Sequence, residues 1–154
     1  MAAPDTSPTR SGVDELTTDA TFFSEHLGWP VTVDVDHERL VVATGGALDA
    51  FRIPRTLAEH VASELSTSLM SGPVSKDDSD RWWTFITAAC QRPSRELPHE
   101  LRSAGIYAVP VGGELVIPPI SKHTSWRHKP RPDQALPPYS TVIAVARQVI
   151  TRGS

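Results

Sequence analysis

Two carboxylates stand two residues apart in the segment 31–36, where apolar and polar residues alternate strictly. This alternation predicts a strand, on which side chains two residues apart leave the same face. Asp34 and Asp36 would then project together. Such a pair can hold one or two Mg²⁺ or Mn²⁺ ions for phosphoryl or nucleotidyl transfer. The alternative is that the two acids form the wet face of an edge strand, because a lone Asp-x-Asp pattern is common by chance.

A third acid, Asp49, stands between Leu48 and Ala50 in the apolar run 47–53. A carboxylate buried in such a strand needs a partner. Asp49 is therefore a further candidate for a metal site with Asp34 and Asp36. The alternative is that it is paired within the fold or lies at the end of the strand.

The segment 121–132, SKHTSWRHKPRP, interleaves cations with an aromatic residue. Cations neutralise phosphates, and an aromatic ring can stack on a base. The candidate nucleic-acid-binding residues are therefore Lys122, Trp126, Arg127, Lys129 and Arg131. The alternative is a solvated basic loop that docks on the acidic N-terminal half of the same chain.

Charge is distributed unevenly along the 154 residues, whose formal net charge is −3. Residues 1–50 hold nine acidic and two basic residues, whereas residues 101–154 hold seven basic and two acidic residues. The C-terminal third could therefore meet an anionic partner such as single-stranded nucleic acid or a nucleotide. The acidic total argues against tight non-specific binding of duplex DNA, which strongly basic domains favour.

Several classes of protein are disfavoured by composition. The only cysteine, Cys90, cannot form an internal disulfide or a multi-cysteine zinc site. No run of 18 apolar residues is present, and the N-terminus lacks the apolar core of a secretory signal. We therefore expect a cytoplasmic protein that has no membrane partner and no resident metal, unless the three aspartates bind Mg²⁺ or Mn²⁺.

The elements that must position these residues follow from periodicity and from the placement of glycine and proline. Residues 1–12 are predicted to be a disordered tail and residues 13–152 a single domain. Helices are predicted at 13–27, 55–70 and 139–151, with a possible helical turn at 98–102. Strands are predicted at 31–36, 40–44, 47–53 and 81–89, and a hairpin at 106–109 and 114–117. Residues 71–80 are predicted to be a polar loop and residues 118–138, with six prolines, an extended irregular segment.

Strands interrupted by helices in this order predict an α+β fold. We expect a mostly antiparallel sheet of about five to six strands with helices packed on it.

Short motifs add a resemblance to a known family. They are GWPV at 28–31, ATGGALDAFRIP at 43–54, GPV at 72–74, RWWTFIT at 81–87 and the late hairpin GIYAVPVGGELVIPP at 105–119. This succession resembles the N-terminal primase-polymerase domain of actinobacterial proteins labelled bifunctional DNA primase/polymerase, a branch of the archaeo-eukaryotic primase superfamily. The likeness runs loosely over residues 20–119.

Active members of that superfamily carry two acids on one strand, a histidine on a following strand and a third acid later. These groups bind two metal ions and the incoming nucleotide. At the matching positions this chain has Asp49 but then Phe51, no histidine in 81–89, and only Glu114 in the late hairpin. The resemblance therefore implies a degenerate, catalytically inactive member, a pseudoenzyme connected with DNA replication.

Three functions stay open on the sequence. The first is a degenerate primase-polymerase-like module that binds nucleic acid or regulates its use. The second is an active nucleotidyltransferase that uses Asp34, Asp36 and Asp49 with Mg²⁺ or Mn²⁺. The third is a protein-interaction module, in which Trp82 or Trp83 and the proline-rich segment dock a protein partner.

Overall fold

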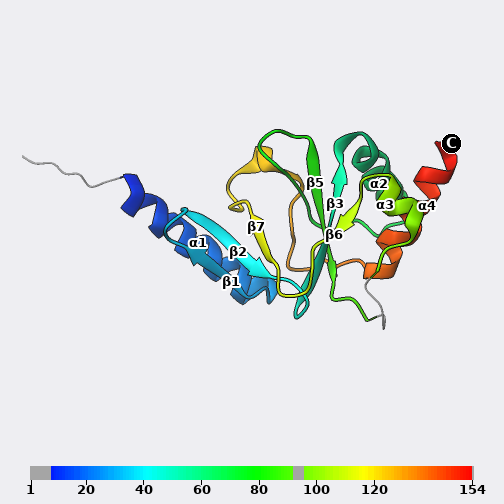
Figure 1. The fold of residues 1–154 in the computed structure, drawn as a ribbon. Helices are drawn as coiled ribbons and strands as arrows, with labels where there is room; N and C mark the ends of the chain where they lie inside the picture. The colour runs from blue at the N-terminus through cyan, green and yellow to red at the C-terminus, as the bar shows by residue number, and fades with distance from the viewer. Residues whose placement is uncertain (1–7, 92–95, 154) are drawn as a thin grey trace, which may run out of the picture.

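The fold consists of two antiparallel sheets with helices packed on them, in a computed structural model that describes residues 8–91 and 96–153. One sheet has three strands in the order β1-β2-β7, and the other has five in the order β6-β3-β5-β4-β8. In Figure 1 the smaller sheet and helix α1 (Pro8–Leu27) lie at one side, and the larger sheet and the remaining helices lie at the other. The α+β class predicted from the sequence is confirmed, with the strands divided between two sheets.

The three-stranded sheet pairs β1 (Val31–Asp34) with β2 (Arg39–Ala43), and β2 with β7 (Glu114–Ile117). Helix α1 packs against it through Leu16, Ala20 and the fully buried Phe23, whose ring stacks on Trp29 at 5.4 Å between centroids. The helix begins at Pro8, five residues before the predicted start at Val13. Residues 8–12 of the predicted tail 1–12 are thus helical, and residues 1–7 of that tail lie outside the described residues.

The five-stranded sheet is built around β3 (Leu48–Pro54) and β5 (Trp82–Ala88), which pair antiparallel along seven residues. The two-residue strand β6 (Tyr107–Ala108) pairs with the outer side of β3. On the other side, β4 (Val74–Lys76) pairs with β5 and then with β8 (Trp126–His128), which forms the far edge.

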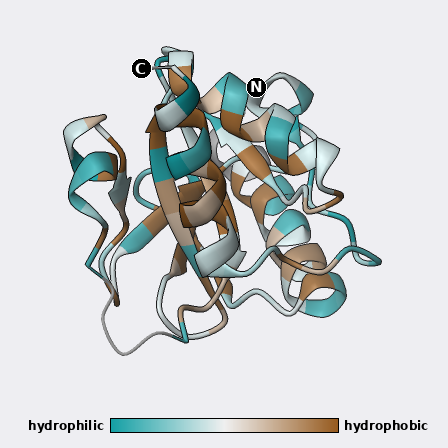
Figure 2. Cartoon of the chain, turned by 90° about the vertical axis from the view of Figure 1, so that its right-hand side faces the viewer, coloured by the Kyte–Doolittle hydropathy of each residue, from teal (hydrophilic) through white to brown (hydrophobic). Residues whose placement is uncertain are grey.

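The residues of β3 alternate between two separate cores because strand side chains alternate between faces. Phe51 and Ile53 belong to the core covered by α2 (Arg55–Thr67), α3 (His99–Ser103) and α4 (Tyr139–Arg152). Leu48 and Ala50 belong to the core shared with α1 and the three-stranded sheet. Figure 2 shows hydrophobic residues along the strands and alternating hydrophobic and hydrophilic residues along the helices, as expected for helices with one face on a sheet.

Two of the three connections that cross between the sheets, from β2 to β3 and from β6 to β7, are hydrogen-bonded to each other. Thr44, buried between them, donates its hydroxyl to the carbonyl of Pro110 at 2.5 Å, and its own carbonyl accepts from the amide of Gly112 at 2.9 Å. Gly45 adopts a φ of +100°, and a Cβ there would lie 2.6 Å from Cγ1 of Val111. The left-handed φ and this close approach favour glycine at position 45, because any other residue would be strained there and would have to displace the side chain of Val111.

The predicted hairpin of 106–109 with 114–117 is wrong. Strand β6 pairs with β3 of the larger sheet, whereas β7 pairs with β2 of the smaller one. The turn at 110–113 is therefore one of the crossings between the sheets. Neighbouring strands joined by a tight turn usually pair, and here pairing partners distant in the sequence replaced the local one.

Two short strands fall where the sequence predicts none. Strand β4 lies in the predicted polar loop 71–80, and β8 lies in the predicted irregular segment 118–138. A 3₁₀ turn at His123–Ser125 immediately precedes β8. Each strand has three residues, too few for a periodic pattern, and each exists because a neighbouring strand supplies backbone partners. The segment 118–138 is thereby tied to the edge of the larger sheet.

Candidate nucleic-acid interface

Asp34 lies at the end of β1 and is held by His37 of the following turn and by Arg39, the first residue of β2. Its Oδ2 accepts hydrogen bonds from Nε of Arg39 at 3.0 Å and from Nδ1 of His37 at 2.9 Å. Partial burial opposes ionisation, but the hydrogen bonds from Arg39 and His37 outweigh it and lower the pKa of Asp34. The backbone amide of His37 also donates to Oδ1 of Asp34 at 3.4 Å, so this carboxylate joins the end of β1 to the turn and to the start of β2.

Asp36 does not share a strand face with Asp34, because β1 ends at Asp34 and Asp36 lies exposed in the turn. The predicted strand 31–36 is thus two residues too long. The turn begins at Val35, whose side chain is 55% exposed and so does not continue the alternation of buried and exposed residues.

Asp49 is completely buried in β3, and its Oδ2 accepts a 2.7 Å hydrogen bond from the backbone amide of Cys90. It lies on the same face of the strand as Phe51, toward the helices. The smaller sheet, which carries Asp34, packs on the opposite face through Leu48 and Ala50. The three aspartates therefore do not converge. Over residues 8–91 and 96–153, no group of three or more His, Cys, Asp or Glu side chains is placed to hold a metal ion.

Trp126 also departs from its predicted role. It is 6% exposed, it packs in the core shared with α1 and the smaller sheet, and its indole Nε1 donates to the carbonyl of Pro119 at 3.1 Å. A ring enclosed in this way presents no face to a base. Trp126 instead anchors the segment 119–128 to the protein.

The cations around Trp126 remain outside. Lys122, Arg127 and Arg131 are exposed and Lys129 is half-buried. Among the described residues, none of these four lies within ion-pair distance of a carboxylate. The alternative of a loop docked on the acidic half through ion pairs gains no support from this arrangement. The arginines that do form ion pairs lie elsewhere on the molecule: Arg39, Arg52, Arg55, Arg102, Arg147 and Arg152.

The pKa of His128, in the middle of this segment, is affected by burial and by the surrounding positive charge. Its half-buried ring is desolvated, and the guanidinium groups of Arg127 and Arg131 repel a proton, so that its pKa is lowered. Lys129 in turn donates to Nδ1 of His123. We call Lys122, Arg127, Lys129 and Arg131 the cationic segment.

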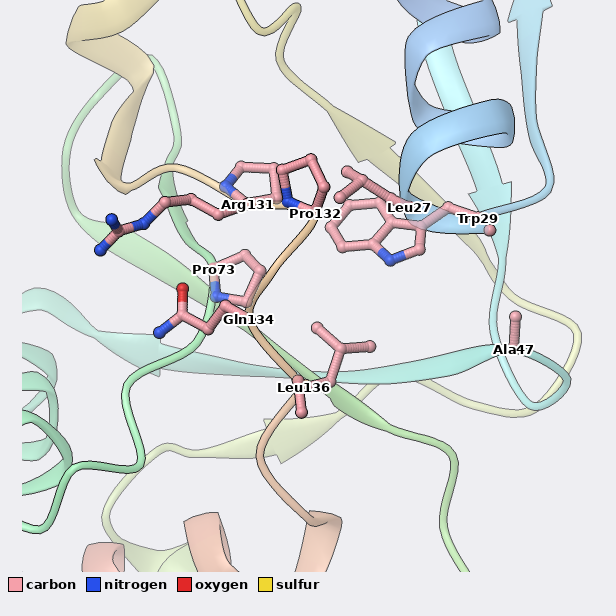
Figure 3. A pocket seen from close by; sticks show the side chains of 11 residues that line it. Leu27, Trp29, Ala47, Pro73, Arg131, Pro132, Gln134 and Leu136 are labelled. Atoms are coloured by element: carbon pink, nitrogen blue, oxygen red, sulfur yellow. The ribbon is translucent and has the colours of Figure 1, made fainter.

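The end of this segment is seated on apolar residues. Pro130, Pro132 and Leu136 line a small cavity of about 210 Å³ together with Leu27 and Trp29 at the end of α1. Figure 3 shows Pro132 beside Leu27 and Trp29, whereas the guanidinium of Arg131 extends away from them. Gln134 donates to the carbonyl of Ser71 at 2.7 Å. The segment is thus held by apolar and amide contacts, which leaves its charges available.

A groove of about 630 Å³ opens between the two sheets, beside the cationic segment. One wall is β7 with Pro118 and Pro119, and the floor is the larger sheet. Its basic side chains are Arg39, Arg52, Lys76 and Lys122. Its acidic side chains are Glu38, Asp77, Asp78 and Glu114. Arg39 lies 3.7 Å from Glu114, and Arg52 lies 3.9 Å from Asp77, so that two pairs of opposite charges face each other within the groove.

A row of polar side chains crosses the floor of the groove. Tyr107, Arg52, Thr84 and Ser75 are direct neighbours on β6, β3, β5 and β4. Directly opposite residues of antiparallel strands point to the same face, so all four side chains face the groove. All four residues line the groove.

Arg52 is held between two aromatic rings. Its guanidinium carbon lies 5.5 Å from the centroid of Trp82 and 5.8 Å from that of Tyr107, and its Nη1 donates to the hydroxyl of Tyr107 at 3.0 Å. The rings of Trp82 and Tyr107 meet edge to face at 5.9 Å. Tyr107 stays 43% exposed. The groove therefore contains a rigidly held aromatic ring and arginine at its floor.

Sequence reasoning singled out neither Arg52 nor Tyr107. Arg52 stands in an apolar run, at a position where the strand alternation turns its side chain away from the Phe51 core. That isolated charge was the available signal. The sequence around Tyr107 contained no such signal. Its position beside Arg52 depends on the pairing of two residues that are 55 positions apart in the chain.

Among the helices of residues 8–91 and 96–153, none combines the length and the apolar character of a membrane span. The cytoplasmic location expected from the sequence stays a prediction.

Comparison of the chain with protein-family models, with curated proteins and with solved structures gives no match. The resemblance to primase-polymerase domains therefore stays a prediction.

Proposed function

We propose that this chain is a binding module for single-stranded nucleic acid, on a scaffold that resembles a degenerate primase-polymerase domain. The observation that carries the proposal is the cationic segment. Lys122, Arg127, Lys129 and Arg131 lie within ten residues of chain, and in the described structure no carboxylate neutralises them. Unpaired cations at this density attract a phosphate backbone.

The lowered pKa of His128 agrees with the proposal. Burial is the first cause of this shift, and the positive potential of Arg127 and Arg131 adds to it. A polyanion is the partner that such a potential favours. The net charge of −3 limits attraction elsewhere on the surface, so that binding would be confined to this face.

The alternative of a metal-dependent nucleotidyltransferase finds less support. Its three carboxylates would need to converge on the ions. Asp34 is bound to Arg39 and His37 in one sheet, and Asp49 faces the helices on the far side of the other. Of the two tryptophans predicted to dock a protein partner, Trp83 is buried and Trp82 packs against Tyr107 and Arg52.

The experiment compares two variants that lose the same positive charge. In the first, Lys122, Arg127, Lys129 and Arg131 are all replaced by alanine. In the matched control, the ion-paired Arg55, Arg102, Arg147 and Arg152 of the helical face are replaced by alanine. Binding of a fluorescein-labelled oligothymidylate is followed by fluorescence anisotropy at several salt concentrations.

We expect the first variant to lose most of its affinity and the control to stay close to the wild type. The salt dependence should also flatten, by about 0.7 in the slope of log K against log salt for each phosphate contact removed. No binding by the wild type, or an equal loss in both variants, would refute the proposal.

A further inference from the structure

The groove beside the cationic segment has the features of a site for an unpaired base. We propose that a single strand lays its phosphates along the cationic segment and inserts one base into the groove between the two sheets, against Tyr107. This inference rests on the proposed function and specifies which part of the nucleic acid the groove receives.

The first support is hydrogen-bonding capacity that the protein leaves unused. Thr84 and Ser75 face the groove from β5 and β4. Within the described residues, neither hydroxyl takes part in a hydrogen bond with the protein. Ser75 is only 4% exposed, so its hydroxyl lies deep at the floor of the groove. A deep hydroxyl that faces a cavity is suited to the donor and acceptor edge of a base.

The second support is the ring of Tyr107. It is 43% exposed, and Arg52 and Trp82 fix its position through the 3.0 Å hydrogen bond and the edge-to-face contact. A ring held in this way loses little conformational entropy when a base stacks on it. Tyr107 thus fills the stacking role that the sequence assigned to Trp126.

The charge of the groove favours a neutral base over a phosphate. Within it, Arg52 lies 3.9 Å from Asp77 and Arg39 lies 3.7 Å from Glu114, and the lining as a whole holds four acidic and four basic side chains. A balanced groove gives little attraction for several phosphates but tolerates a neutral base. The cations outside the groove, for which the described structure shows no carboxylate partner, favour phosphates instead.

Lys122 joins the two regions, because it belongs to the cationic segment and also lines the groove. A phosphate on Lys122 would place the adjoining sugar and base at the opening of the groove. A volume of about 630 Å³ lies within the range of small-molecule sites and admits a nucleoside. A base paired in a duplex is not free to enter, so the site favours single strands.

The test separates bases from phosphates with two labelled oligonucleotides of equal length. One is oligothymidylate, and the other is an abasic strand with the same phosphates and no bases. Both are titrated by anisotropy with the wild type, Tyr107→Leu, Tyr107→Phe and Thr84→Val. Thermal unfolding by circular dichroism confirms that each variant is folded.

We expect the wild type to bind oligothymidylate on the order of 10-fold more tightly than the abasic strand. Tyr107→Leu should abolish this preference without changing affinity for the abasic strand, and Tyr107→Phe, which keeps the ring but loses the hydrogen bond from Arg52, should retain most of it. Thr84→Val should reduce the preference and gives the same test if Tyr107→Leu does not fold.

The proposal is overturned if the wild type binds both strands equally, or if Tyr107→Leu and Thr84→Val keep the full preference for bases. In these cases the cationic segment remains a phosphate-binding surface, so the proposed function stands. If the wild type binds neither strand, the proposed function fails and the groove loses its assigned ligand with it.

Discussion

The indole Nε1 of Trp126 donates a 3.1 Å hydrogen bond to the backbone carbonyl of Pro119. This bond closes the loop that carries the 3₁₀ turn at His123–Ser125 and starts β8. The ring beneath it is buried against the core of the smaller sheet and α1. Trp126 thus has a structural role. By anchoring the basic segment, it keeps the neighbouring charged side chains at the surface.

Replacement of Trp126 should therefore destabilise the protein. Trp126→Ala is expected to lower the free energy of unfolding by about 3–5 kcal/mol, because it leaves a cavity in a packed core. Trp126→Phe keeps most of the apolar area and loses the hydrogen bond to Pro119, for a smaller loss of about 1–3 kcal/mol. Urea unfolding measures both. A Trp126→Ala protein of wild-type stability would show that the ring is not packed as described.

Asp34 predicts a specific dependence of stability on pH. Partial burial opposes its ionisation, yet the hydrogen bonds from Arg39 and His37 lower its pKa below the ordinary value of 3.8. The folded state therefore holds this proton more weakly than the unfolded state does. The stabilisation is fully present above the unfolded pKa and is lost as the pH falls through the folded pKa.

The measurement compares Asp34→Asn with Asp36→Asn in urea unfolding between neutral and strongly acidic pH. Asp34→Asn should be less stable than the wild type at pH 7, and the difference should shrink as the pH falls below about 4. Asp36→Asn, which removes an exposed carboxylate of the same turn, is the matched control. A gap between wild type and Asp34→Asn that stays constant with pH would contradict the expectation.

Asp49 should affect folding and leave nucleic-acid binding unchanged. Asp49→Ala removes the acceptor of the 2.7 Å hydrogen bond from the amide of Cys90, and a buried amide without an acceptor costs about 1–3 kcal/mol. Asp49→Asn keeps one oxygen as an acceptor and should be the milder change. Urea unfolding and anisotropy are measured on the same samples. Reduced binding by a stably folded Asp49→Ala protein would indicate a functional role instead.

His128 offers a spectroscopic measure of the charge around it. Its pKa is lowered by burial and by the charges of Arg127 and Arg131. Bound phosphates would offset those charges, so an oligothymidylate should raise the pKa of His128, as measured by NMR titration of the imidazole. By linkage, binding should tighten as the pH falls from the pKa of His128 in the complex to its lower pKa in the free protein. A pKa of His128 that stays unchanged when the protein is saturated with the oligonucleotide would contradict the expectation.

Local sequence pattern determined much of the secondary structure. Apolar spacing predicted α2 and α4, and alternation with turn residues predicted β1 with its antiparallel partner β2. These elements follow from interactions within a few residues, which is why a pattern of period 2 or 3.6 is enough to find them. The exposed cations 122–131 were also visible, since charge that lacks a nearby opposite charge in the chain tends to remain at the surface.

Tertiary structure alone decided which strands pair and which residues share a site. Residues 107–108 join β3 and residues 114–117 join β2, and a hydrogen bond from Thr44 to Pro110 links two of the three crossings between the sheets. The same long-range pairing separates Asp49 from Asp34, buries Trp126, and brings Tyr107 beside Arg52 at the floor of the groove. Hydrogen bonds and apolar contacts between residues far apart in the chain set these positions, and no spacing along the sequence encodes them.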